Sequence, residues 1–144
     1  MINKKVFNII GYVLLFLGIS MLFSAGWSYY YREPEAFNAI SNSFLITSFS
    51  GFLLIILTQF SLKKYFPFFT FKKREKFELS SRDGYILVTF SWIAMAIFSA
   101  LPFYFFQGPF TNYLDCFFEA ISGLTTTGAS ILSSDQINNT PKGI

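Results

Sequence analysis

Residues 125–128 are the part of the sequence whose types and spacing best suit a chemical role. They are Thr125, Thr126, Thr127 and Gly128. Threonine is β-branched and favours extended backbone, and glycine readily takes a positive φ, which lets successive carbonyls turn towards a common axis. A monovalent cation can exchange its water for such carbonyl oxygens. We therefore expect these four residues, called the candidate filter below, to form one wall of an ion-selectivity filter.

The segment before the candidate filter is typical of a short helix that begins at Asn112 and ends near Ile121. Asp115 follows Asn112 by three residues, which is close to a capping box, and Ser122 with Gly123 weakens the continuation of the helix. About a dozen residues span roughly 18 Å, or half a bilayer. Because lipid cannot satisfy the backbone groups at such an end, protein or water must surround it.

Residues 112–131 thus predict a re-entrant pore helix followed by a filter loop. If the helix enters from the outer surface, its C-terminus points towards the centre of the membrane. That end carries about half a negative charge, so it stabilises a cation and not an anion.

Asp115 and Glu119 are four residues apart and share one face of this helix. Carboxylates in a membrane segment are functional candidates by default. We expect Asp115 at the outer rim, where it attracts cations, and Glu119 hydrogen-bonded to the loop behind the filter. The alternative is that both only cap the helix or face an aqueous vestibule. As a catalytic pair they lack a nucleophile and a set of metal ligands, so we expect no enzymatic activity.

The composition indicates a membrane protein. Hydrophobic residues make up 53% of the 144 residues, charged residues only 13%, and the mean hydropathy is +0.47, whereas soluble domains average about a quarter charged. Histidine is absent and Cys116 is the single cysteine, so no intrachain disulfide can form and His-based sites are excluded. Cys116 has apolar neighbours and is expected to act as a small hydrophobe.

Three apolar runs are long enough to span a membrane: residues 6–27, about 37–62 and about 85–106. The first could be a signal peptide, but its apolar core is longer than usual, which favours a retained helix. Gly11, Gly18 and Gly26 would let a neighbouring helix approach closely. The second run carries polar side chains that we expect to face other helices, namely Asn38, Asn42, Thr47, Ser48 and Ser50. Pro34 is a natural start for the second helix, and Pro102 can kink the end of the third.

Residues 63–83 form a basic loop with seven of the eleven Lys and Arg residues of the chain. By the positive-inside rule this loop is cytoplasmic, and the N-terminus lies on the same side because two spans separate them. The loop could dock a cytoplasmic partner or anionic lipid, or its charges could serve topology alone. The basic residues are confined to short segments, which argues against a nucleic-acid partner.

Two stretches resemble a known family. The sequence SRDGYILVTFSWIAMAIFSALPF (residues 81–103), followed by LDCFFEAISGLTTTGAS (residues 114–130), resembles the first pore repeat of the Trk/Ktr/HKT potassium transporters, and most closely the Trk-type membrane subunit. The two preceding spans are similar to the extra N-terminal helix pair of that subunit. The resemblance divides the chain into a two-helix hairpin (1–62), the basic cytoplasmic loop (63–83) and a first pore repeat without its inner helix (84–144).

The resemblance implies an all-α membrane protein with three transmembrane helices, a re-entrant pore helix and a filter loop, as part of a four-repeat, potassium-channel-like fold. It implies that oxygens of the candidate filter line a path for K+ in a bacterial inner (plasma) membrane. It also implies a homodimer of the full-length subunit and a cytoplasmic, nucleotide-binding Trk regulatory subunit as partners, besides membrane lipids.

The chain contains one filter sequence, and a single wall cannot enclose an ion. We expect it to be the N-terminal fragment of a longer protein; the alternative is that other subunits complete the pore. Three functions follow. The first is potassium uptake. The second is a non-conducting membrane scaffold or accessory subunit, in which residues 112–131 are an amphipathic surface segment. The third, a membrane enzyme, would depend on Asp115 or Glu119.

Overall fold

The computed structural model describes residues 4–63, 80–110 and 112–144, which form six α-helices. Two long helices, α1 (Lys4–Tyr30) and α2 (Pro34–Lys63), are followed by α3 (Ser81–Ser99) and the short α4 (Leu101–Phe106). The remaining helices are α5 (Tyr113–Leu124) and α6 (Ser134–Asn139). Most of the basic loop, residues 64–79, lies outside the described residues, so its predicted role stays a prediction.

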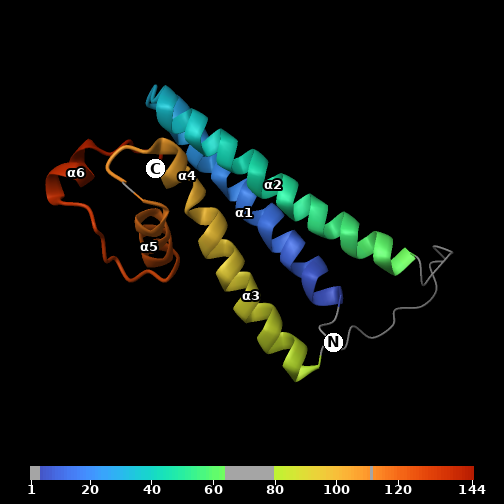
Figure 1. Ribbon diagram of the computed structural model, residues 1–144. Coiled ribbons are helices and arrows are strands. Elements are labelled where there is room, and N and C mark those ends of the chain that lie inside the picture. The colour runs from blue at the N-terminus through green and yellow to red at the C-terminus, as the bar shows by residue number, and fades with distance from the viewer. Residues whose placement is uncertain (1–3, 64–79, 111) are drawn as a thin grey trace.

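The α1–α2 pair is an antiparallel hairpin with a tight turn (Figure 1). Arg32 takes a positive φ of 58° in this turn, and α2 begins at Pro34 as predicted, since proline at the first helical position loses no hydrogen bond. The Glu33 carbonyl accepts the Phe37 N–H at 3.0 Å. Aromatic side chains gather at this end of α1, where the Trp27 and Tyr31 rings are 5.5 Å apart.

Close backbone approach holds the hairpin together. A Cβ on Gly11 would lie 2.9 Å from the Gly51 carbonyl oxygen, and a Cβ on Gly51 would lie 2.8 Å from the Gly11 carbonyl oxygen. The close approach expected at Gly11 is confirmed, and so is that at Gly18, which packs against Ser48. The expectation is wrong for Gly26, because nothing lies within 4 Å of a Cβ there.

Polar side chains of the hairpin are partly satisfied inside it. Asn8 Nδ2 donates to Thr58 Oγ1 at 2.9 Å, and Thr47 is fully buried. The inward orientation expected of the polar residues of α2 is therefore confirmed for Thr47. Asn38 and Asn42, by contrast, are exposed, because they fall on the face of α2 that is turned away from α1.

The third predicted span is divided into two helices. It starts at Ser81, ends as α3 at Ser99, and continues as α4. Pro102 lies in the first turn of α4 and cannot donate to the Phe98 carbonyl four residues earlier. The kink expected at the end of this span is therefore confirmed, and it begins at Ala100, ahead of the proline.

The long helices α1, α2 and α3 run in alternating directions between two ends of the molecule. The described start of α1, the end of α2 and the start of α3 lie at one end, and the α1–α2 turn and α4 lie at the other (Figure 1). α3 packs along α1, and α4 packs against α2. This is the arrangement that three consecutive spans require.

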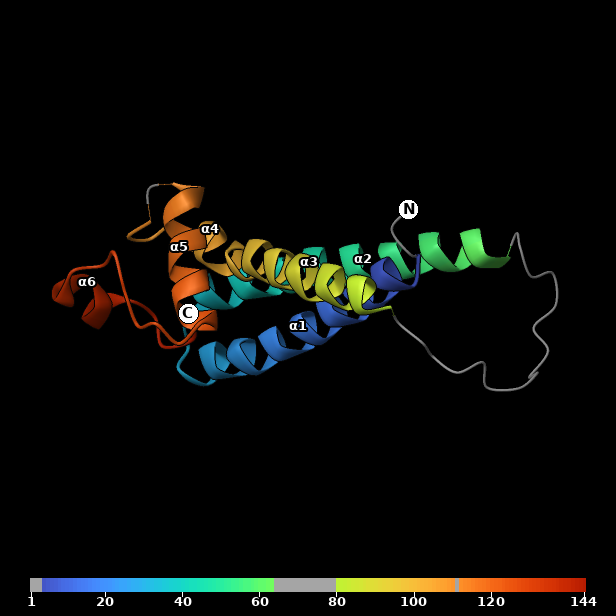
Figure 2. The ribbon, with the colours of Figure 1, turned by 90° about the horizontal axis from the view of Figure 1, so that it is seen from below.

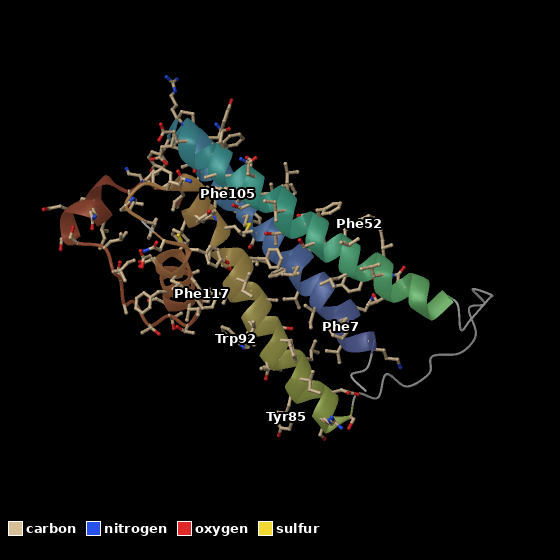
Figure 3. All side chains as sticks on the ribbon, in the orientation of Figure 1. Phe7, Phe52, Tyr85, Trp92, Phe105 and Phe117 are labelled. Carbon is tan, nitrogen blue, oxygen red and sulfur yellow. The ribbon has the colours of Figure 1, made fainter. Side chains whose placement is uncertain are left out.

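The surface of the long helices is strongly apolar. Large side chains such as Phe7, Phe52, Tyr85 and Trp92 are exposed (Figure 3). Soluble monomers rarely expose contiguous apolar surface on this scale. Three helical stretches, 5–30, 34–59 and 81–106, are long and apolar enough to cross a membrane, and lipid or further helices would cover their outer faces.

Candidate functional site

α5 is the short helix that the sequence predicts ahead of the candidate filter. It has 12 residues, about 18 Å in length. Asn112 is its N-cap residue, with extended backbone and a carbonyl that accepts the Asp115 N–H at 3.1 Å. The Asn112 side chain makes no capping hydrogen bond, so the capping box expected with Asp115 does not form.

One face of α5 packs against the α3–α4 corner. Cys116 and Ala120 are buried there with Ala100 and Phe110. The Tyr113 hydroxyl donates to the Ile97 carbonyl at 2.7 Å. Cys116 is a free thiol with 1% of its surface exposed, which confirms its interpretation as a small core residue. The small side chains at 116 and 120 let α5 come close to this corner.

α5 is steeply inclined to α3 (Figure 2). Its first residue, Tyr113, contacts the Tyr104 ring of α4 at a centroid distance of 5.7 Å. Its far end reaches an apolar groove of about 220 Å³. The groove is lined by Trp92, Ile93 and Ala96 of α3, by Phe117, Ile121 and Leu124 of α5, and by Thr125. α5 therefore starts beside α4 and ends beside the middle of α3, where Trp92 and Phe117 lie (Figure 3).

The candidate filter begins with a helix-ending turn. The Thr127 N–H donates to the Ser122 carbonyl at 3.0 Å, and the Thr126 N–H donates to the Gly123 carbonyl at 3.1 Å. These two bonds form a Schellman motif, in which the residue between the cap and the last donor is left-handed and usually glycine. Here that residue is Thr126, with φ of 55°.

Two expectations about this turn are wrong. The helix does not end near Ile121 but continues to Leu124, because the Schellman bonds and the Thr125 hydroxyl, which donates to the Ile121 carbonyl at 2.8 Å, satisfy the last carbonyls. Thr125 and Thr126 are not extended: Thr125 has φ of −88° and ψ of 1°, and Thr126 is left-handed. The positive φ expected of Gly128 is confirmed at 72°.

The threonine hydroxyls form a short chain. Thr125 Oγ1 lies 2.7 Å from Thr127 Oγ1. Because the single hydroxyl hydrogen of Thr125 is donated to Ile121, Thr127 is the donor to Thr125. All four residues of the candidate filter are exposed. Residues at the surface are accessible to an ion, as cation ligands must be.

Two side chains of α5 hold the segment that leaves the candidate filter. Ser122 Oγ donates to the Ala129 carbonyl at 2.5 Å, and Glu119 Oε2 accepts the Ile131 N–H at 3.3 Å. The predicted hydrogen bond between Glu119 and the neighbouring loop is thus present, although its role in a filter stays a prediction. The sequence patterns did not lead us to predict this bond of Ser122. Its spacing of three residues from Glu119 places both side chains on one face of α5, and this spacing could have indicated a shared role.

Hydrogen bonds engage backbone carbonyls on both sides of the candidate filter. The Ser122 and Gly123 carbonyls are used in the turn, and the Ala129 carbonyl is turned back to the buried Ser122 side chain. The candidate filter therefore lies between carbonyls that are already hydrogen-bonded. Asp115 is half-buried in the first turn of α5, where the helix dipole favours a negative charge.

Nothing in the described part of the chain assembles a conventional metal centre. No group of three or more His, Cys, Asp or Glu side chains that could hold a metal ion occurs among those residues. A cation at this site would depend on backbone and hydroxyl oxygens, which suits a weakly held monovalent ion more than a tightly bound divalent one.

The described residues have the fold of a helical membrane protein, with three helices long and apolar enough to span the bilayer. Sequence similarity narrows it further. The chain is 29% identical over 141 residues to the Trk system potassium uptake protein TrkH of Vibrio parahaemolyticus, across 98% of this chain. It is 48% identical over 60 residues to TrkH of Salmonella typhimurium and 33% identical over 70 residues to TrkG of Escherichia coli. The chain is thus related to the Trk system potassium uptake proteins.

The similarity covers part of each relative. The chain spans 26% of the Vibrio protein, and the matched segments span 12% of the Salmonella protein and 14% of the Escherichia coli TrkG protein. Within this chain the matched segments cover 42% and 49% for the latter two. No protein-family model matches the chain. The relatives are named as uptake proteins and not as enzymes.

Proposed function

We propose that this chain supplies one wall of a potassium pathway in a Trk-type uptake protein. Residues 125–128 contribute the oxygens, α5 is a re-entrant pore helix, and further repeats of a longer protein complete the ring. The observation that carries the proposal is the exposed position of the candidate filter, at the C-terminal end of a helix about half a bilayer long and between carbonyls that are already hydrogen-bonded.

The orientation of α5 supports a re-entrant placement. The helix begins beside α4, near the α1–α2 turn end of the molecule, and ends beside Trp92 in the middle of α3. If α3 spans the bilayer, Thr125 and the residues after it lie near half depth. The C-terminal dipole end of α5 then points at the candidate filter and favours a cation there.

The names of the relatives indicate which ion is transported. TrkH and TrkG are named as potassium uptake proteins, and K+ is an ion that sheds its water onto carbonyl oxygens at modest cost. We place the protein in the bacterial inner membrane, with the start of α1 and the basic loop in the cytoplasm. By the same relationship we propose a homodimer of the full-length protein and a cytoplasmic nucleotide-binding regulatory subunit as its partner.

Replacing Gly128 tests the proposal. In the full-length protein, expressed in bacteria that lack their own potassium uptake, Gly128→Val should abolish K+-dependent growth and reduce rubidium uptake by at least about 100-fold. The reason is twofold: a β-branched residue is strongly disfavoured at a φ of 72°, and its side chain would enter the ion path.

Gly26→Val is the matched control, because nothing lies within 4 Å of a Cβ at Gly26 and its φ is not positive. That variant should transport like the wild type. If the Gly128→Val protein is present in the membrane at normal abundance and also transports like the wild type, the filter assignment is wrong. A non-conducting scaffold would then be the better interpretation of the function.

A further inference from the structure

The α1–α2 turn binds a segment more than a hundred residues away in the sequence. Glu33 Oε1 accepts the backbone N–H of Lys142 at 3.0 Å, and Glu33 Oε2 accepts that of Gly143 at 3.3 Å. One half-buried carboxylate therefore uses both of its oxygens on two consecutive amides. Hydrogen bonds to a charged acceptor are about twice as strong as neutral ones.

Other contacts fit the same segment to α1. Ser24 Oγ donates to the Gly143 carbonyl, and Ile144 packs with Met21, Ala25 and Ile40. A Cβ on Gly143 would overlap the buried Ser28 side chain, so only glycine fits at this point. Backbone, apolar and steric contacts thus agree on one docked position.

The docked segment ends the stretch of chain that follows the candidate filter. The chain leaves the candidate filter, passes the bond between Glu119 and Ile131, forms α6, and returns to the hairpin at residues 141–144. This returning end lies near the α1–α2 turn, where Glu33 binds it (Figures 1 and 2), and Gly143 and Ile144 line one groove with Pro102 and Phe103 of α4. The stretch after the filter is therefore held at both ends: by α5 at residues 129–131 and by the hairpin at residues 142–144.

We propose that Glu33 is a positioning residue for the pore repeat. It anchors residues 142–143 to the N-terminal hairpin, and the hairpin thereby acts as an external brace for the filter segment. The anchoring itself is independent of the transport assignment, whereas its effect on ion selection rests on the function proposed above.

The first measurement detects the anchoring directly. Ile144→Cys is introduced into full-length protein that also carries Cys116→Ala, and intact cells are treated with a membrane-impermeant maleimide. Ile144 is half-buried against α1 and α2, so labelling should be slow. Glu33→Gln keeps one acceptor oxygen and loses the charge, and it should speed labelling about tenfold, the effect of weakening charged hydrogen bonds.

Glu35→Gln is the matched control, because it removes the same charge two residues away on an exposed side chain that makes none of these bonds. Ser24→Ala removes a single bond to Gly143 and should speed labelling by about threefold. This variant replaces Glu33→Gln in the test if Glu33→Gln does not reach the membrane. Equal labelling rates in the wild type, Glu35→Gln and the Glu33 or Ser24 variant would overturn the anchoring.

The second measurement tests the effect on the filter. In the same cells the ratio of rubidium to sodium uptake should fall about threefold or more in Glu33→Gln and stay unchanged in Glu35→Gln. Faster labelling with an unchanged ratio would overturn the positioning role. A wild-type protein that takes up neither ion would instead refute the proposed function, while the labelling rates would still decide whether Glu33 anchors the segment.

Discussion

The α1–α2 hairpin and the α5–filter unit obtain their conformations in different ways. In the hairpin, the backbones at Gly11 and Gly51 approach so closely that a Cβ on either would collide with the other's carbonyl. In the α5–filter unit, bonds between near neighbours set the shape: Thr127 to Ser122, Thr125 to Ile121 and Ser122 to Ala129. The hairpin is a packed scaffold, whereas the filter turn is a locally bonded segment with an open face.

Hydrogen bonds to α5 explain why the candidate filter, although exposed and strained, can keep one conformation. Ions need accessible oxygens, so the candidate filter cannot be buried in a core. Its backbone is instead bonded to α5 at both ends. Thr126 and Thr127 donate to α5 in the Schellman turn, and the side chains of Ser122 and Glu119 bind the residues that follow the candidate filter. The hairpin contributes at longer range, through Glu33.

The largest expected effect concerns the scaffold. Gly51→Leu should destabilise the hairpin by about 3 kcal/mol, because its Cβ would meet backbone atoms of α1 that cannot move aside. Thermal unfolding of the purified full-length protein in detergent measures this. Gly26→Leu, which meets open space, should leave the unfolding temperature almost unchanged; a similar loss in both variants would refute the close-packing argument.

A smaller effect is expected at the bond behind the filter. Ser122→Ala removes the donor to the Ala129 carbonyl and should cost about 1–2 kcal/mol locally, since that carbonyl loses its partner. We expect a lower ratio of rubidium to sodium uptake at normal membrane abundance, because the free carbonyl can turn. Ser20→Ala, which removes an exposed bond to the Leu17 carbonyl, provides the comparison, and an equal ratio in both variants would contradict a special role for Ser122.

The smallest effect is expected at the left-handed threonine. Thr126→Gly should relieve the strain of a β-branched residue at a φ of 55°, which costs about 1–2 kcal/mol, so the unfolding temperature should rise slightly. Thr127→Gly lacks this benefit, because Thr127 does not have a positive φ, and it also loses the bond to the Thr125 hydroxyl. A fall in unfolding temperature for Thr126→Gly as large as that for Thr127→Gly would show that the strain is absent.

Some features of the site follow from sequence patterns. The start of α5 at the N-cap residue Asn112, the positive φ of Gly128 and the contact of Glu119 with the following loop could all be predicted, because each depends on residue type and local spacing. The end of α5 could not. Gly123 and the threonines disfavour helix, but a Schellman turn with Thr126 in the left-handed position overrides that preference by satisfying the last carbonyls.

By itself, the sequence determined three membrane-spanning helices, a half-length helix and an exposed run of threonine and glycine, because hydrophobicity and backbone preference are properties of neighbouring residues. Tertiary structure alone decided that Gly11 meets Gly51 while Gly26 meets nothing, that Ser122 binds the Ala129 carbonyl, and that Glu33 captures the amides of Lys142 and Gly143. A contact across many residues depends on where whole helices pack, and no local pattern records that.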